Sequence, residues 1–502
     1  MGDEYLLGEN HYCTYGDIGR ILNRYSFEEK MRICHKYSHK LVDVNGAINI
    51  EKMLRLRIPY PWELETFVLL AITSNKEYNN NNFDGKEENK FIHMINAIRD
   101  YAPKNLDENG LAMMLVSLGL NQFYPQECFY YRLFKYSYIL NYKSENVDVQ
   151  KCFIDKFGVG FNEFMELGYF LNTIYSIPDK ADINKIVNYV LNEFYPNAYS
   201  ALSITRDEYI RQLKLVTDKP ELYIYCLRPS YTYAFIQENN YVYFPLPHLI
   251  KRNVSSSLLY RITQNNDSLR QKIGKEVLEN YLYELLKNSM SYDEIFKEVD
   301  YEKSKQDTGK SLDVLLREKD QYLLIDSKSS VPSIGLRVMD KRSFDKTIDI
   351  MGKIIVQIYN QLTKAFGIKY NPFISDIKIT RENTWGIAAI LEDNYIPRHL
   401  IYENAAQKLK IEIGSSAYIW MSNHIKIVSF YDIERFSLIG ASIIEALIDQ
   451  EKRGEYNSFS LGELPHCQGK IVNQEYLRFR EDNSKLFLKT VNKLCDMGFI
   501  TR

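Results

Sequence analysis

Two carboxylates and one lysine lie close together in two apolar stretches of this 502-residue chain. The stretches Lys310–Leu316 and Tyr322–Lys328 flank a charged turn, and this pattern predicts a β-hairpin of two largely buried strands. Asp326 and Lys328 are two residues apart, so on a strand both side chains leave from the same face, and Asp313 lies near the same open end of the hairpin. Buried strands seldom carry charges without a partner or a chemical role. The hairpin therefore predicts a site where two carboxylates and an ammonium group converge.

Hydrolysis of a phosphodiester bond needs this mixture of groups. Carboxylates bind Mg²⁺, the metal polarises a phosphoryl oxygen and activates water, and a cation stabilises the negative charge that develops. The residue types assign Asp313 and Asp326 to the metal, and Lys328 to the transition state or to orientation of the water. The main-chain carbonyl of Ser327 would complete the oxygen shell of the metal.

A short string of an acidic residue, any residue and lysine decides little by itself. Glu28–Lys30 lies in a polar, helical stretch, and Asp376–Lys378, although typical of a strand, follows a long helix and has no acidic strand before it. Only Asp326–Lys328 follows an acidic strand and lies between two helical patterns, at about 271–288 and 346–366. This context selects the string that begins at Asp326.

The sequence from about Ile273 to Phe366 resembles the PD-(D/E)xK, or restriction-endonuclease-like, superfamily of nucleases. The resemblance is carried by Asp313, by Asp326-Ser-Lys328 and by the amphipathic helix that precedes them. It implies an αβββαβ core and a metal-dependent phosphodiesterase. Leu312 stands where the family name has proline, and aspartate is the less frequent acidic choice at position 326, but the superfamily tolerates both departures.

The same resemblance implies two further site residues. Family members place an acidic residue of the first helix in the metal site, and Glu279 is the position that matches. A helical wheel alone leaves Glu279 and Glu284 open, because they lie on opposite edges of the apolar stripe, and we rank Glu279 first. Gln357, on the polar side of the next helix, resembles a glutamine that some subfamilies place near the metal. The implied ligands of Mg²⁺ or Mn²⁺ are Glu279, Asp313, Asp326 and the main-chain oxygen of Ser327.

Each of these residues also has a purely structural interpretation. Asp313, Asp326 and Lys328 would also satisfy one another as an ion pair between neighbouring strands. Glu279 would then be the solvated edge of a helix, and Gln357 a surface or bridging residue.

Basic residues flank the proposed site on both sides along the chain. A phosphate backbone that follows a cleft needs such cations, although exposed lysines and arginines also form ordinary solvated surface. These residues are Lys341, Arg342 and Lys346 after the hairpin, and Arg261, Arg270, Lys272 and Lys275 before Glu279. We therefore expect a nucleic-acid partner, DNA rather than RNA.

Composition is that of an ordinary folded protein, with 45% hydrophobic and 25% charged residues. The 63 basic and 65 acidic residues nearly cancel, so any phosphate-binding surface must be local. Seven scattered cysteines and no long apolar run predict a reducing, cytoplasmic location without a membrane span. Cys34, His35 and His39 have no further close ligands in the sequence and do not predict a zinc site.

Length and pattern predict an α+β protein of three domains, because single cores stop growing near ~250–300 residues. Residues 1–217 have helical apolar spacing, interrupted by an Asn-rich loop at 79–86, and we expect them to regulate the protein or to bind a protein partner or a second copy. Residues 218–432 form the expected nuclease domain with a mixed sheet, and residues 433–502 a helical extension. The nuclease domain begins with β-favouring runs at 223–227, 234–237 and 241–244, and further strands are expected at 384–391 and 425–430.

Together these features predict a metal-dependent endonuclease that hydrolyses DNA. Fusion of the nuclease core to large helical segments resembles the effectors of prokaryotic anti-phage and restriction-type defence. Two alternatives stay open, an RNA-cleaving effector and a catalytically inactive scaffold or interaction protein. The intact Asp313, Asp326 and Lys328 count against the scaffold.

Overall fold

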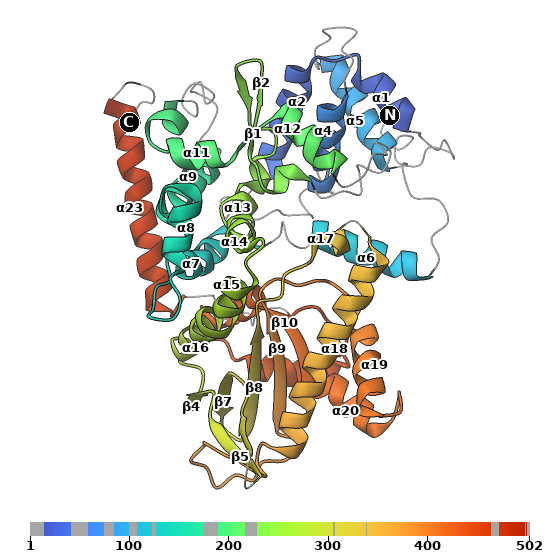
Figure 1. The fold of residues 1–502 in the computed structure, drawn as a ribbon, viewed down its shortest axis with the longest axis vertical. Coiled ribbons are helices and arrows are strands. Elements are labelled where there is room, and N and C mark those ends of the chain that lie inside the picture. The colour runs from blue at the N-terminus through green and yellow to red at the C-terminus, as the bar shows by residue number, and fades with distance from the viewer. Residues whose placement is uncertain are drawn as a thin grey trace.

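The computed structural model shows an α+β protein with mixed sheets and with helices at both ends of the chain (Figure 1). It describes residues 15–41, 59–74, 85–99, 108–122, 127–174, 189–215, 228–304, 307–337, 339–462, 471–496 and 498. Within these ranges no helix combines the length and the apolar character that crossing a membrane requires.

A five-stranded sheet contains the predicted hairpin, and its strand order is β10-β9-β8-β7-β4. β4 (Glu294–Lys297), β7 (Val314–Glu318) and β8 (Gln321–Lys328) pair antiparallel to one another. β9 (Thr384–Ile390) and β10 (Ile425–Ser429) extend the sheet with parallel pairing. β8 is therefore the central strand, which explains its nearly continuous apolar sequence.

Helices cover both faces of this sheet. Successive side chains of β8 point to opposite faces and therefore pack into two different cores. Leu324 packs into the core under α18 (Lys341–Lys364), whereas Ile325 packs into the core under α16 (Glu279–Lys287). In Figure 1, α18 crosses one side of the sheet and α16 lies at the end of the sheet where β8 finishes.

The helix expected at 271–288 consists of three segments. α15 (Asp267–Lys272) leads into a π-helical turn, η5 (Ile273–Leu278), which continues into α16. β7 begins at Val314, three residues later than expected, because Asp313 leaves the strand pairing to bond with Ser327. The other elements predicted between 322 and 430 are present, with shifted ends.

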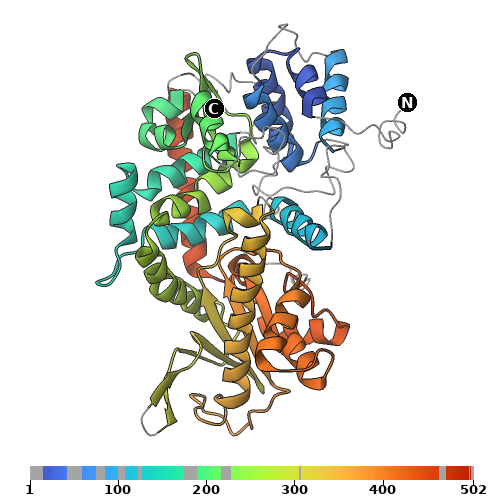
Figure 2. The same ribbon diagram turned by 45° about the vertical axis from the view of Figure 1, so that its right-hand side comes forward.

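Two strand elements between α16 and β7 were not predicted. β4 is only four residues long and half polar, and the strands of the β5–β6 hairpin (Asp300–Ser304 and Asp307–Lys310) are short and mostly polar. Neither gives the alternation or the apolar run by which strands are predicted. The β5–β6 hairpin projects beside the edge of the sheet (Figure 2).

The described residues up to 215 are helical, as predicted, apart from β1 (Ser203–Thr205). β1 joins β2 (Phe235–Glu238) and β3 (Tyr241–Tyr243) in a small sheet, so the strands predicted at 234–237 and 241–244 are confirmed. The helices are α1 (Tyr15–Leu22), α2 (Phe27–Leu41), α4 (Pro61–Thr73), α5 (Gly85–Arg99), α6 (Glu108–Gln122), α7 (Phe129–Leu140), α8 (Val149–Phe157), α9 (Phe161–Ile174), α11 (Pro196–Ala201) and α12 (Arg206–Lys214).

Some predictions for this half fall outside the described residues: the boundary near 218, the run 223–227 and most of the loop at 79–86. The last two residues of that loop, Gly85 and Lys86, were wrongly predicted, because they begin α5. Glycine is tolerated at the start of a helix, where its conformational cost is smallest.

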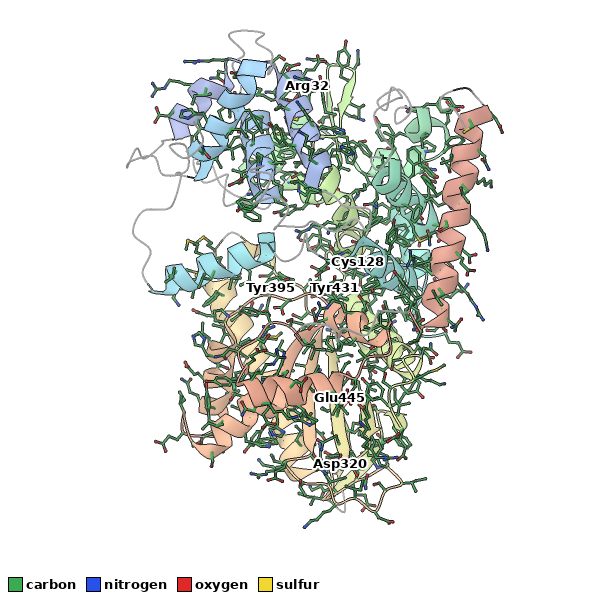
Figure 3. The ribbon with its side chains drawn as sticks, turned by 180° about the vertical axis from the view of Figure 1, so that it is seen from behind. Arg32, Cys128, Asp320, Tyr395, Tyr431 and Glu445 are labelled. Atoms are coloured by element: carbon green, nitrogen blue, oxygen red, sulfur yellow. The ribbon has the colours of Figure 1, made fainter. Side chains whose placement is uncertain are left out.

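The chain after β10 is helical, as predicted, with α21 (Phe430–Ser437), α22 (Ile443–Arg453) and α23 (Gln474–Asp496). α23 returns to lie beside α9, which places the C-terminal helix against the helices of the N-terminal half (Figure 1). Figure 3 shows Cys128 and Tyr431 meeting where α7 approaches α21, and the Cys128 N–H donates to the Tyr431 hydroxyl at 3.0 Å. One hydrophobic core thus joins α7, α9, α16, the sheet and α22, and the division into three domains stays a prediction.

Candidate active site

Asp326 and Lys328 leave β8 on the same face, at the end of the strand. They lie opposite Ala388 and Ile390 of the parallel strand β9. The Asp326 side chain is 3% exposed and that of Lys328 is 32% exposed, and Lys328 Nζ lies 2.7 Å from Asp326 Oδ2. A buried carboxylate is therefore paired with an ammonium group that reaches solvent.

Asp313 lies one residue beyond the paired part of β7, whose register with β8 ends at Val314 opposite Ile325. Its Oδ2 accepts two hydrogen bonds from Ser327, from the main-chain N–H at 2.6 Å and from the hydroxyl at 2.8 Å. Since Ser327 stands between Asp326 and Lys328, these bonds bring Asp313 to the acidic string.

Glu279 is the first residue of α16 and follows the π-helical turn η5 directly. π-Helical turns are rare and are frequent at functional sites. η5 approaches the end of β8 closely, because a Cβ added to Gly274 would stand only 3.0 Å from Ser329 Oγ. This close approach positions the start of α16 beside the end of the strand that carries the lysine.

The four charged side chains interact strongly. Burial, together with the negative charges of Asp313 and Glu298, raises the pKa of Glu279 to about 8, whereas the charge of Lys328 acts in the opposite direction. Burial likewise raises the pKa of Asp326 to about 6, against the stabilising charge of Lys328. The pKa of Asp313 is also raised by burial, although its bonds to Ser327 lower it. Mutually repelling carboxylates with raised pKa values are typical of sites that bind a cation or transfer a proton.

Glu298 is a member of this cluster that the sequence did not indicate. It follows β4 directly, is exposed, and its charge raises the pKa values of Glu279, Asp313 and Asp326. Its carboxylate contacts the ammonium group of Lys310. The signal that would have found it is an acidic residue at the end of a short strand before Asp313, but β4 was not predicted.

The donor types suit Mg²⁺ or Mn²⁺, which prefer carboxylate and carbonyl oxygens. Asp326 Oδ2 is buried, and apart from its ion pair with Lys328 no hydrogen-bond donor is oriented toward it. Within the described ranges, however, no three His, Cys, Asp or Glu side chains stand close enough together to form a metal site. The residues thus have the donor types that the metal prefers, but in this structure the carboxylates lie too far from one another to hold one ion together.

The structure places the other candidates away from this cluster. Gln357 is exposed on α18, and Gln361, one turn further on, donates its Nε2 to the Lys310 carbonyl at 2.8 Å instead. The charge of Glu284 acts on Tyr138 of α7. Asp376–Lys378 lies in an exposed stretch of bends, so its strand-like sequence does not form a strand. The reason is its setting after α18, where the chain turns before β9.

The flanking basic residues differ in their surroundings. Arg261 donates to the Ala201 carbonyl at 2.8 Å and Lys272 to the Asn146 carbonyl at 3.3 Å, so both are directed toward the N-terminal helices. The charge of Lys275 acts on Glu279. The residues at the start of α18 are exposed, namely Lys341, Arg342 and Lys346.

Comparison with known proteins gives no further information on identity, since no family model, no curated protein and no solved structure matches this chain.

Proposed function

We propose that this protein is a metal-dependent endonuclease that hydrolyses DNA phosphodiester bonds. One observation carries the proposal: at the end of β8, buried Asp326 is paired with the partly exposed Lys328, and Asp313 bonds to the residue between them. Glu279 adds a third interacting carboxylate. Apart from the β5–β6 hairpin between β4 and β7 and the short helix α17, the order of helix, three antiparallel strands, helix and parallel strand is the one expected for the αβββαβ core of a PD-(D/E)xK nuclease, and this supports the proposal.

The side chains have distinct roles in this mechanism. Asp326 holds the Lys328 ammonium, which donates to a non-bridging phosphate oxygen and stabilises the charge of the transition state. Ser327 fixes Asp313 with two hydrogen bonds, so that its other oxygen is oriented for the metal. Asp313, Asp326, Glu279 and the Ser327 carbonyl would hold Mg²⁺ or Mn²⁺, which when bound supplies Lewis-acid polarisation of the phosphate and activates water. Glu279 must first lose its proton, because its pKa of about 8 keeps it largely neutral at pH 7.

The helical segments on both sides of the core support a biological setting by analogy. Effectors of prokaryotic anti-phage or restriction-type defence combine a nuclease core with a segment that senses a trigger or binds a partner. We assign that role to the helices before residue 218.

The test is incubation of the purified full-length protein with supercoiled plasmid, linear DNA and RNA, in the presence of Mg²⁺, Mn²⁺ or EDTA. We expect cleavage of DNA that requires the metal and that is abolished in Asp326→Asn. Asp376→Asn is the matched control, because Asp376 belongs to the same three-residue pattern but is exposed and lies away from the cluster. Cleavage of RNA alone would reassign the substrate, and full activity of Asp326→Asn would overturn the assignment of the site.

A further inference from the structure

A cavity adjoins the candidate active site but contains none of its carboxylates. It lies between α14 (Ser256–Thr263), α15 and the loop that follows β8. About 90 Å³ is open to the centres of water molecules, which corresponds to room for roughly six to nine waters. This is the size of a single planar heterocycle, and too small for a folded peptide segment.

The lining of the cavity is mainly apolar, with a flat aromatic and cationic wall. The Arg252 guanidinium lies over the Tyr231 ring, 4.0 Å from its centroid. The Tyr231 ring is itself held in place, because its hydroxyl donates to Glu65 at 2.7 Å. Tyr260, 37% exposed, lies at the opening. Planar heterocycles bind to such surfaces through stacking on aromatic rings and guanidinium groups.

The polar groups of the lining are hydroxyls and charged side chains. Thr232, Ser256, Ser257, Thr263 and Ser329 contribute aliphatic hydroxyls, and Arg252 and Arg270 contribute two positive charges. Glu392 is the one carboxylate of the lining, and it already accepts from Arg132 at 3.0 Å and from the Tyr136 hydroxyl at 3.1 Å. The remaining charge of the lining is therefore positive, which favours a ligand that carries a phosphate.

The cavity shares its wall with the catalytic cluster. Ser329 directly follows Lys328, and Ile273 begins the π-helical turn that leads to Glu279. A group that enters the cavity thus lies beside both elements that carry the site.

We infer that this cavity binds one nucleobase, with the attached phosphate directed toward Arg270. The inference rests on the proposed function and deepens it, because a base held apart from its stack requires a single-stranded, frayed or unpaired position in the substrate. The shared chemistry is that of a nucleotide, whose source is either the nucleic-acid strand or a free nucleoside monophosphate.

The experiment measures binding in EDTA, so that it is independent of cleavage. Full-length protein is titrated with a short fluorescent single-stranded oligonucleotide and with an abasic oligonucleotide of the same length, and separately with free nucleoside monophosphates. In the wild type we expect the strand with bases to bind about fivefold to a hundredfold more tightly, as stacking of one base is worth ~1–3 kcal/mol. Thr263→Phe fills the cavity and should reduce this preference to near unity, whereas Thr263→Val preserves the volume and should retain it.

A second pair of variants guards against misfolding of Thr263→Phe. Tyr260→Ala removes the ring at the opening and should weaken the preference, whereas Tyr241→Ala, a control at an exposed tyrosine of β3, should not. Loss of monophosphate binding in Thr263→Phe, with unchanged oligonucleotide binding, would identify a free nucleotide as the ligand. Equal preference for bases in the wild type, Thr263→Phe and Tyr260→Ala would overturn the inference. If that result came with metal-dependent cleavage, the inference about the cavity would fail and the proposed function would stand. If the wild type preferred bases but cleaved nothing, the cavity would still bind a base and the proposed function would fail.

Discussion

Replacement of Asp326 by asparagine separates a catalytic carboxylate from a structural ion pair, because the two interpretations predict opposite changes in stability. The pKa of Asp326 is raised from 3.8 to about 6 by burial, so the folded protein resists ionisation of this group. A difference of about two pKa units corresponds to ~3 kcal/mol at ~1.4 kcal/mol per unit. Asparagine cannot ionise, so Asp326→Asn should remove this cost.

The sign of the pH dependence follows from the direction of the shift. Below the unfolded pKa of about 3.9 the Asp326 carboxyl is protonated in both states, so it does not lower the free energy of unfolding. As the pH rises from there through the folded pKa of about 6, the free energy of unfolding of the wild type falls, whereas that of the variant does not. Lys328 is 32% exposed, so it can be solvated when its partner is removed.

Thermal unfolding gives the most direct measurement. With an unfolding entropy of ~2.1 cal/mol/K per residue, a chain of 502 residues that unfolds as one unit gains about 1 °C in Tm for each kcal/mol. We therefore expect Asp326→Asn to melt about 3 °C above the wild type at pH 8 in EDTA, and at nearly the same temperature at pH 4. Excess Mg²⁺ should stabilise the wild type by ~2.7 kcal/mol at a hundredfold excess over Kd, and so raise its Tm by about 3 °C, and should have much less effect on the variant.

A structural ion pair would give the reverse result. Removal of one partner of a buried pair costs ~3–5 kcal/mol, so the variant would melt below the wild type at pH 8, and neither protein would respond to Mg²⁺. The exposed Asp376→Asn serves as control and should melt with the wild type at both pH values. A variant that is less stable at pH 8, together with a wild type insensitive to Mg²⁺ and Mn²⁺, would refute the catalytic assignment of Asp326.

Three further predictions concern activity. Lys328→Met should lower metal-dependent cleavage by two or more orders of magnitude (about 2.7–4 kcal/mol for loss of one group that stabilises the transition state), and cleavage within tenfold of the wild type would contradict its role. Glu279→Gln should weaken Mg²⁺ binding and cleavage, whereas Glu284→Gln should not, because the charge of Glu284 acts on Tyr138; a metal titration of activity distinguishes the two. At limiting Mg²⁺ the cleavage rate should rise with pH, with a midpoint at about 8, where Glu279 ionises. Glu298→Gln removes a negative charge near Glu279 and should move this midpoint to lower pH. An unchanged midpoint would exclude Glu298 from the cluster.

The strand that carries the site could be predicted because its signal is local. β8 is buried on both faces, so its sequence is an apolar run in which Asp326 and Lys328 are conspicuous exceptions. Position 313 could be predicted for the same reason, but not the way it reaches the site. Its two hydrogen bonds to Ser327 depend on the residue leaving the strand register, and no periodicity encodes that departure.

The helix residue illustrates what a periodic pattern cannot supply. Glu279 and Glu284 both belong to α16, where they lie on opposite edges of the apolar stripe. A helical wheel alone therefore could not choose between them. The choice is made by the close approach of Gly274 to Ser329, a contact between positions far apart in the sequence. Glu298 was missed for a related reason, since β4 is recognisable only by its pairing with β7.

The helical half, predicted to have a separate role, supports the site through buried charges. Lys135 of α7 lies 3.4 Å from the fully buried Glu434, which also accepts from the Tyr281 hydroxyl at 2.8 Å. Burial raises the pKa of Glu434, and the charge of Lys135 opposes this shift, so the carboxylate depends on a cation from the N-terminal half. Tyr281 lies two residues after Glu279 on α16. A change that moves α7 would therefore disturb the packing of the helix that carries Glu279, without any residue of the N-terminal half having to enter the site.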